Sequence, residues 1–439
     1  MKPALLRICV FCTSHLLLIV VFFAPNASSA NLKPLTNIAA FQTIMVEGGD
    51  VAMALGADIS SLSLAAIFDD EMEPIPYQID EYNQGGAVYF KNWSVPIDGT
   101  INVLDRADKL LFLQKDSGER RLPHHRFDGK LLAEISLMGT DGITRYVYLL
   151  QGSRLRSEEQ YVRHSGEDGL VESDFYSLTY NPDNHVEWKD FTIENYEALE
   201  NPLDALKLRL ESGILTPFNT VKLSNDQLVA TPSGVNVGPI RTTSQLDLIV
   251  WMYKLPMMKV SLQIHHYPKS LVYDVRIVMP KVRRSMLVAP TLSMTLDGNA
   301  LIGTSIRTAM GPKQAATVDG KLSDLEKDIV EAGASAKNNW NWASTSKKLD
   351  VLSFFDFIGD TNEPISLVYI DDKDKVDKPE RFVGQLPNMG YKIEHLPDSG
   401  LLGFAISLYI SNGFRGEPEW FSRSIRTMPE IQISKVANH

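Results

Sequence analysis

Short apolar runs broken by turn residues recur along the chain after residue 30, and they predict β-strands rather than helices. Up to residue 151, strands are predicted at Thr43–Val46, Ala65–Phe68, Ile75–Ile79, Lys109–Gln114, Leu131–Met138 and Thr144–Gln151. Longer strands are then predicted at Ser244–Tyr253, Lys259–Tyr267, Leu271–Pro280, Ser285–Leu296, Ile365–Ile370 and Leu401–Ile410. Because an average strand has about five or six residues, the long ones predict broad, curved sheets packed face to face.

Helical patterns are scarce, and the clearest one covers Ser323–Ala332. Ser323 and Glu326 have the spacing of a capping box, and Gly333 follows where a helix can end. The chain is therefore predicted to be all-β, with few short helices.

The segment from Lys259 to Pro280 predicts a hairpin whose register can be chosen from its two faces. An even-numbered loop, such as Tyr267–Ser270 with Pro268 at the second turn position, keeps one face apolar. On that face, Val260, Leu262, Ile264 and His266 pair with Leu271, Tyr273, Val275 and Ile277. The opposite face then carries a polar patch made of Ser261, Gln263, His265, Val272, Asp274 and Arg276.

A stretch rich in charge and poor in apolar residues, Gly152–Gly169, predicts a domain boundary. We expect a small β-sandwich-like domain at 31–165 and a large sandwich of long antiparallel strands at 166–439.

The first thirty residues have the pattern of a cleavable export signal. Lys2 and Arg7 precede an apolar stretch, and small residues end the segment at Ala30. A retained membrane anchor is the alternative, but Thr13, Ser14 and His15 interrupt the stretch, which falls short of the roughly 20 apolar residues of a span. Cleavage near Ala30 leaves no cysteine, because Cys9 and Cys12 lie in the leader. We expect a periplasmic or extracellular protein with no membrane span after cleavage.

The net charge and the absence of several standard motifs reduce the number of possible functions. The 439 residues include 43 Lys and Arg against 54 Asp and Glu, a net charge of −11, which argues against a nucleic-acid partner. The chain has no G-x-S-x-G, H-E-x-x-H, Walker or G-x-G-x-x-G motif, so no cofactor is predicted.

Four segments together resemble a family of exported β-sandwich proteins with the supersandwich fold, which includes galactose-mutarotase-like and rhamnogalacturonan-lyase-like modules. They are Pro74–Asp80, Asp108–Gly118, Gly238–Arg241 and the closing strand Leu401–Ile410. The resemblance implies a supersandwich in the large domain and raises the expectation of contact with saccharides, but it transfers no catalytic residue.

The polar patch of the hairpin is the candidate catalytic site. His265 would lie beside Gln263, Asp274 and Arg276, where an imidazole near a carboxylate can act as a general base and a guanidinium can hold a sugar carboxylate. The alternative is a solvated sheet face with one Arg–Asp pair.

Two further clusters are candidate ligand-binding residues. Trp340, Asn341 and Trp342 combine indole faces that stack on sugars with an amide that pairs with hydroxyls, although both indoles could instead cover the edge of the core. His185 and Glu187 lie two apart on a predicted strand, so they share a face as an acid/base pair or as an exposed ion pair.

No metal site is predicted. Asp371–Asp377 is dense in carboxylates but lacks the Gly and distal Glu of an EF-hand and includes two lysines, and His124–His125 has no further ligand at suitable spacing.

The leading hypothesis is an exported, non-catalytic protein that binds a polysaccharide or an envelope partner. One alternative is a polysaccharide lyase or sugar epimerase that acts at His265, Asp274 and Arg276. Another is a structural or assembly component that recruits a second chain by strand addition.

Overall fold

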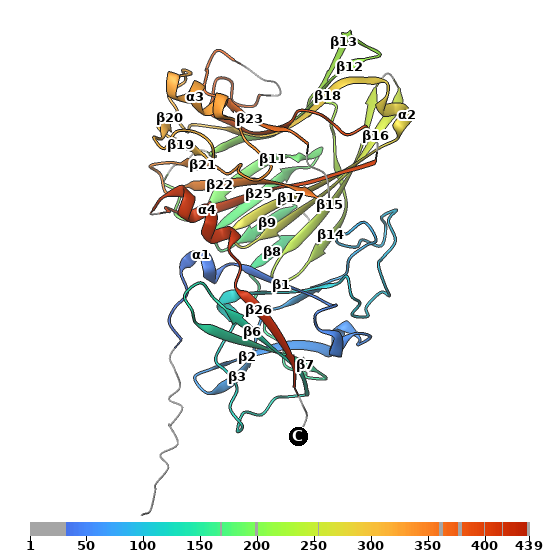
Figure 1. The fold of residues 1–439 in the computed structure, drawn as a ribbon, viewed down its shortest axis with the longest axis vertical. Helices are drawn as coiled ribbons and strands as arrows, with labels where there is room; N and C mark the ends of the chain where they lie inside the picture. Colours follow the sequence, from blue (N-terminus) through green and yellow to red (C-terminus); the bar gives the residue numbers. More distant parts are fainter. Residues whose placement is uncertain are drawn as a thin grey trace, which may run out of the picture.

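The computed structural model describes residues 32–166, 169–197, 201–252, 254–359, 363–375, 380–398, 400–414 and 416–436. The predicted leader at 1–30 lies outside these ranges. The fold is all-β, as predicted, and its strands form two lobes (Figure 1). None of the helices in the described ranges is long and apolar enough to cross a membrane.

The lower lobe in Figure 1 holds the N-terminal part of the chain, in which two sheets enclose a core. One sheet has the order β1 (Thr43–Glu47), β5 (Lys109–Leu113), β4 (Gln78–Asp80). The other has the order β26 (Glu430–Lys435), β6 (Lys130–Met138), β7 (Thr144–Gln151), β2 (Leu62–Phe68), β3 (Glu71–Pro74). Ile44, Leu64 and Ile135 are among the residues buried between them.

The upper lobe is a large sandwich with three sheets, as the long strands predicted. The largest has nine strands in the order β14 (Thr231–Val237), β15 (Thr242–Met252), β16 (Leu255–Tyr267), β17 (Ser270–Met279), β25 (Gly400–Ser411), β22 (Asp350–Ile358), β21 (Asn341–Ser344), β19 (Ser305–Thr308), β20 (Ala316–Thr317). A five-stranded sheet has the order β13 (Thr216–Leu223), β12 (Leu203–Ile214), β18 (Leu287–Gly298), β24 (Asn388–Ile393), β23 (Ile365–Ile370). A four-stranded sheet has the order β11 (Asn184–Ile193), β10 (Tyr176–Asn181), β9 (Leu170–Ser173), β8 (Val162–Ser165).

Helices are short and lie between the strands. The α-helices are α1 (Asn37–Ala40), α2 (Lys281–Arg284), α3 (Asp324–Ala332) and α4 (Pro418–Arg426), and the 3₁₀ turns are η1 (Ala52–Ala54), η2 (Ile59–Ser61) and η3 (Gln114–Asp116). The predicted capping box is present in α3, where Ser323 and Glu326 bond each other's backbone N–H, and Gly333 ends the helix with φ 68°.

The register of the β16–β17 hairpin matches the prediction. Val260 pairs with Ile277 and His266 with Leu271, and Tyr267 pairs with Ser270 to close the two-residue loop. The apolar face enters the core of the upper lobe through Leu262, Ile264 and Tyr273. The polar face of the hairpin therefore points out of that core.

Two details differ from the predicted pattern. The strand expected at Ile75–Ile79 begins only at Gln78, because Pro76 offers no N–H to a ladder. The segment from 166 onward is expected in the large domain, yet its last strand, β26, pairs with β6 in the lower lobe. In Figure 1, β26 runs from α4 down into that lobe, so the end of the chain joins the two lobes.

Candidate functional site

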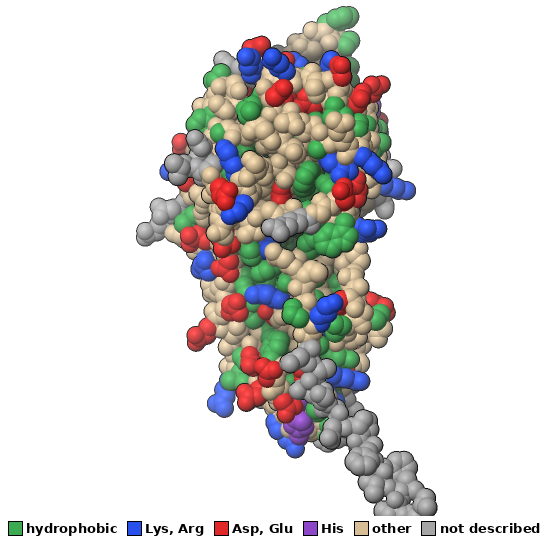
Figure 2. Space-filling model, turned by 90° about the vertical axis from the view of Figure 1, so that its left-hand side faces the viewer, with side chains coloured by type: hydrophobic (Ala, Val, Ile, Leu, Met, Phe, Trp, Pro, Cys, Tyr) green, Lys and Arg blue, Asp and Glu red, His purple; other side chains and the backbone are tan. Residues whose placement is uncertain are grey.

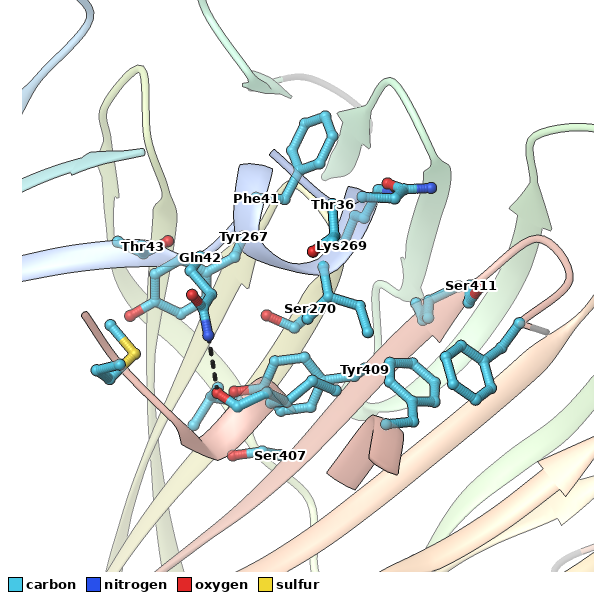
Figure 3. A pocket seen from close by; sticks show the side chains of 18 of the residues that line it. Thr36, Phe41, Gln42, Thr43, Tyr267, Lys269, Ser270, Ser407, Tyr409 and Ser411 are labelled. Atoms are coloured by element: carbon cyan, nitrogen blue, oxygen red, sulfur yellow. Dashed lines mark hydrogen bonds between the residues drawn. The ribbon is translucent and has the colours of Figure 1, made fainter. Parts of the chain in front are cut away.

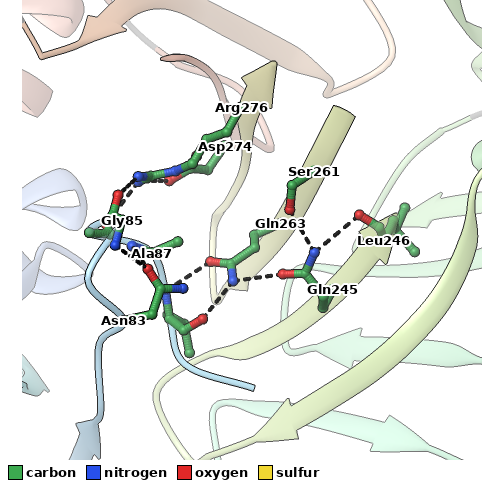
Figure 4. A network of polar contacts seen from close by, with 11 residues as sticks. Asn83, Gly85, Ala87, Gln245, Leu246, Ser261, Gln263, Asp274 and Arg276 are labelled. Carbon is green, nitrogen blue, oxygen red and sulfur yellow. Dashed lines mark hydrogen bonds and ion pairs between the residues drawn. The ribbon is translucent and has the colours of Figure 1, made fainter. Parts of the chain in front are cut away.

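The polar face of the β16–β17 hairpin is covered by a loop from the lower lobe (Figure 4). The Val88 backbone N–H donates to Gln263 Oε1 at 3.0 Å, and Gln263 Nε2 donates to the Val88 carbonyl at 2.8 Å. Arg276 donates to the Gly85 carbonyl and, at 2.8 Å, to the Gly86 carbonyl. The polar patch therefore forms a contact between the lobes.

The three predicted catalytic residues do lie on this face, and each is engaged in that contact or buried beside it. Arg276 pairs with Asp274 at 2.9 Å, and these side chains are only 9% and 13% exposed. His265 is buried and its Nδ1 lies 3.0 Å from Thr243 Oγ1. Burial, together with the nearby Arg241, holds the pKa of His265 well below its usual value, so the ring is neutral at pH 7. A catalytic role for these residues stays a prediction.

Arg241 is the centre of the same contact, although sequence reasoning did not select it as a site residue. Its buried guanidinium lies 2.6 Å from Asp80 Oδ2 and donates to Tyr267 Oη at 2.7 Å and Tyr82 Oη at 3.1 Å. Gln78 Oε1 accepts the Arg241 backbone N–H at 3.1 Å. These bonds join two segments that carried the family resemblance, Pro74–Asp80 and Gly238–Arg241.

The Trp340–Trp342 segment belongs to an apolar cluster rather than to an open platform. Trp340 is 7% exposed and packs in a cluster with Phe354 and Phe421, against which Trp342 lies half-buried. Asn341 is buried between them in β21. The alternative interpretation, in which both indoles cover the edge of the core, describes this packing.

His185 and Glu187 share a face of β11, as the period of two predicted. His185 stacks on Tyr180 with ring centroids 5.7 Å apart, and burial lowers the pKa of its imidazole. Glu187 accepts a hydrogen bond from Asn181 Nδ2 at 2.9 Å. Each side chain therefore has its own partner on the neighbouring strand β10.

The structure brings Asp70 to His124 and His125, a carboxylate that sequence spacing could not reveal. Asp70 Oδ1 lies 3.0 Å from His124 Nε2 and 2.9 Å from His125 Nε2. However, His125 Nδ1 accepts the Leu122 N–H at 2.8 Å, so the proton of the neutral ring is on Nε2. That nitrogen then donates to Asp70 and has no lone pair free for a metal.

Two other clusters of acidic residues also have partners within the protein. Asp204, Asp297 and Glu380 lie close together, and the buried Lys207 ammonium sits 2.5 Å from Asp297 Oδ2 and also pairs with Glu380. In the carboxylate-rich segment Asp371–Asp377, Asp371 is buried and accepts the Asp319 and Gly320 N–H groups at 2.9 and 2.8 Å, and burial raises its pKa to about 6. Residues 376 and 377 lie outside the described ranges.

A cavity of about 720 Å³ opens where the lobes meet, and Figure 3 shows its lining side chains. Its walls come from the α1–β1 segment, the β16–β17 turn, β25 and α4. We call it the junction cavity. Aromatic and hydroxyl side chains mix in the lining, which includes Phe41, Tyr267, Tyr409, Phe414, Trp420, Phe421, Thr36, Ser270, Ser407 and Ser411.

The aromatic wall is built by α4 and the segment before it. Phe414 stacks on Phe421 with centroids 4.1 Å apart and on Trp420 at 5.7 Å. Trp420 remains 43% exposed. Figure 2 shows hydrophobic side chains gathered at mid-height on the face of the molecule that carries α1 and α4.

Lys269 is the one charged side chain among the described residues that line the junction cavity. It occupies the β16–β17 turn, where its Nζ lies 4.5 Å from the centre of the Phe41 ring and 3.8 Å from that of Phe175. It also donates to Asn37 Oδ1. Burial lowers the pKa of Lys269 to about 8.

Sequence reasoning missed the junction cavity because its walls are far apart in the chain. They come from residues 36–45, 267–272 and 407–431. The only available signal was the turn at Pro268–Lys269, which was used for the hairpin register alone.

No protein-family model and no curated protein sequence matches the chain. Among solved structures, an α-mannosidase from Enterococcus faecalis V583 is similar at 10% identity, with a TM-score of 0.47 over 91% of this chain and 45% of that one. This chain therefore spans about half the length of that enzyme. A galactose mutarotase-like protein from Clostridium acetobutylicum is 8% identical, with a TM-score of 0.34 over 58% of this chain and 100% of that one. A heparan sulfate lyase HepC mutant from Pedobacter heparinus is 9% identical, with a TM-score of 0.33 over 61% of this chain and 38% of that one. At these values the likeness is a weak one of fold.

Proposed function

We propose that this protein is a non-catalytic binding protein that holds a saccharide in the junction cavity. The observation that carries the proposal is the mixture of aromatic faces and hydroxyl groups around one hollow. Trp420 and Tyr409 offer rings for the C–H faces of a sugar, and Ser270 and Ser407 offer partners for its hydroxyls.

The side chains that line the junction cavity also indicate whether it could cleave a glycosidic bond. Glycoside hydrolysis uses a pair of carboxyl groups, one as acid and one as base or nucleophile. The described residues that line the junction cavity include no Asp or Glu. The proposal is therefore one of binding without bond cleavage.

The test compares two exposed tryptophans. We expect Trp420→Ala to weaken the retention of the protein in saccharide-containing affinity gels about 5- to 30-fold, because a lost stacking ring in a pocket removes on the order of 1–2 kcal/mol. Trp251→Ala is the matched control, since Trp251 is 54% exposed and lies outside the cavity lining. Equal retention of both variants, or failure of the wild type to bind any saccharide of a broad array, would remove the proposal.

The competing proposal is a lyase or epimerase that uses His265, Asp274 and Arg276. Its test is a screen of uronic-acid polymers for absorbance from unsaturated products. Full activity of His265→Ala would discard that assignment, and the contact of Arg276 with Gly85 and Gly86 argues for the structural role.

We also propose that the protein works outside the cytosol after removal of residues 1–30. The support is the charged, apolar and small-residue pattern of that segment. N-terminal sequencing of the protein from an envelope fraction should begin near Asn31, and recovery of the intact leader in the cytosol would reject export.

A further inference from the structure

A second hollow, of about 890 Å³, lies in the lower lobe between the loop 119–130, β6 and the end of β26. We call it the basic groove. Its lining carries the five cations Arg120, Arg121, Arg126, Lys130 and Lys435 and a single carboxylate, Glu134. All five cations are exposed. Such a concentration stands out in a chain whose acidic residues outnumber its basic ones by 54 to 43.

Among the described residues, most of this positive charge has no carboxylate partner. Glu134 is shared by Arg120 at 3.6 Å and Arg121 at 3.7 Å. Arg126 donates to the Pro123 carbonyl at 3.3 Å and pairs with no carboxylate among the described residues. Within the described ranges, Lys130 and Lys435 have no carboxylate within ion-pair distance. An anion entering the groove would therefore meet cations that need not give up another partner.

The loop that carries the arginines is held in place by its neighbours. The Arg121 N–H donates to Tyr148 Oη at 2.5 Å, and the Phe127 ring packs on the Tyr148 ring with centroids 5.1 Å apart. His125 links the loop to Asp70, with His125 Nε2 2.9 Å from Asp70 Oδ1. A loop backbone that is already ordered loses less conformational entropy when a ligand binds.

We infer that the basic groove is a binding site for a polysaccharide that carries carboxylate groups. Guanidinium groups hold carboxylates with two parallel hydrogen bonds, and lysines add point charges along the same hollow. The acidic excess of the rest of the chain disfavours the binding of a polyanion elsewhere. The inference does not depend on the junction cavity, which has a separate lining.

The lining also favours a polysaccharide over a single-stranded nucleic acid. Proteins that bind single strands stack the bases on exposed aromatic rings. Among the described residues that line the groove, the aromatic side chains are His125 and Phe127, and Phe127 is half-buried and packed on Tyr148. The groove can therefore bind a ligand through its positive charge rather than by stacking bases on aromatic rings.

The experiment measures the binding of polygalacturonate to the full chain by affinity electrophoresis and calorimetry. The groove variant is Arg126→Ala, Lys130→Ala, Lys435→Ala, chosen because these three cations have no ion-pair partner in the part of the chain that the structure describes. The control is Lys313→Ala, Lys321→Ala, Lys337→Ala, which removes the same charge from exposed positions outside the groove lining. Thermal unfolding confirms that both variants fold.

We expect the groove variant to bind polygalacturonate at least about tenfold more weakly than the wild type. The affinity of the control variant should stay within about twofold of the wild-type value. The wild-type affinity should fall with added salt, because salt screens the charges. Equal losses in both variants, or no binding of polygalacturonate by the wild type, would overturn the inference. Tighter binding of oligothymidylate through the same three residues would replace it with nucleic-acid binding. Unchanged polygalacturonate affinity of Trp420→Ala separates this outcome from that of the junction cavity.

Discussion

Arg241 and Asp80 form a buried ion pair across the contact between the two lobes, with Arg241 Nη2 2.6 Å from Asp80 Oδ2 and both side chains at most 2% exposed. Tyr82 and Tyr267 take further hydrogen bonds of the same guanidinium. The pair holds the lower lobe against the end of the hairpin that also lines the junction cavity.

Replacing Asp80 with Ala should destabilise the protein strongly. The change leaves the buried Arg241 charge without its carboxylate, which costs about 3–5 kcal/mol in comparable pairs. Urea unfolding provides the measurement. Lys222→Ala is the control, because its pair with Glu211 is exposed and such pairs contribute about 0–1 kcal/mol. Similar losses in the two variants would contradict a central role for Arg241.

Replacing Gln263 with Leu should open the contact above the polar face of the hairpin. The Val88 N–H and carbonyl would both lose their partner, at a cost of about 1–3 kcal/mol for buried groups. Hydrogen exchange at the Val88 amide should become faster. The control is Gln432→Leu, the same substitution at an exposed position of β26, which should leave the exchange rate of the Val88 amide unchanged. Persistent protection of Val88 in Gln263→Leu would show that the loop is held by other contacts.

The Lys269 ammonium should affect stability in the alkaline range. Its pKa in the folded protein is about 8, below the ordinary value of 10.5 that the unfolded chain retains. Between these values the unfolded state binds more protons, so wild-type stability should rise with pH relative to Lys269→Met. Denaturant unfolding from pH 7 to pH 10.5 measures the difference. A difference that stays constant with pH would place the Lys269 ammonium in solvent instead.

Replacing Trp340 with Ala distinguishes core packing from sugar stacking. Removal of the buried indole should lower the free energy of unfolding by about 3–5 kcal/mol. The exposed Trp251→Ala should change the unfolding free energy by about 0.5 kcal/mol or less. A stable Trp340→Ala variant with reduced saccharide binding would instead support the stacking interpretation of Trp340–Trp342.

Local sequence patterns predicted correctly those features that depend on residues close together in the chain. The hairpin register followed from alternation in β16 and β17, because a one-residue slip would place Asp274 and Arg276 in the core. The start and end of α3 followed from Ser323, Glu326 and Gly333, since caps are formed within one turn. The all-β fold followed from strand periodicity.

What covers each exposed face was decided only by the tertiary structure. The alternation placed Gln263, His265 and Arg276 on one side of a sheet, but it carried no information about the Gly85–Val88 loop that lies on them. Likewise, Asp70 meets His125, and β26 pairs with β6, across long separations in sequence. A period of two or 3.6 residues records which way a side chain points, whereas its partner depends on how distant segments fill space together, and so the junction cavity and the basic groove could be found only in the folded chain.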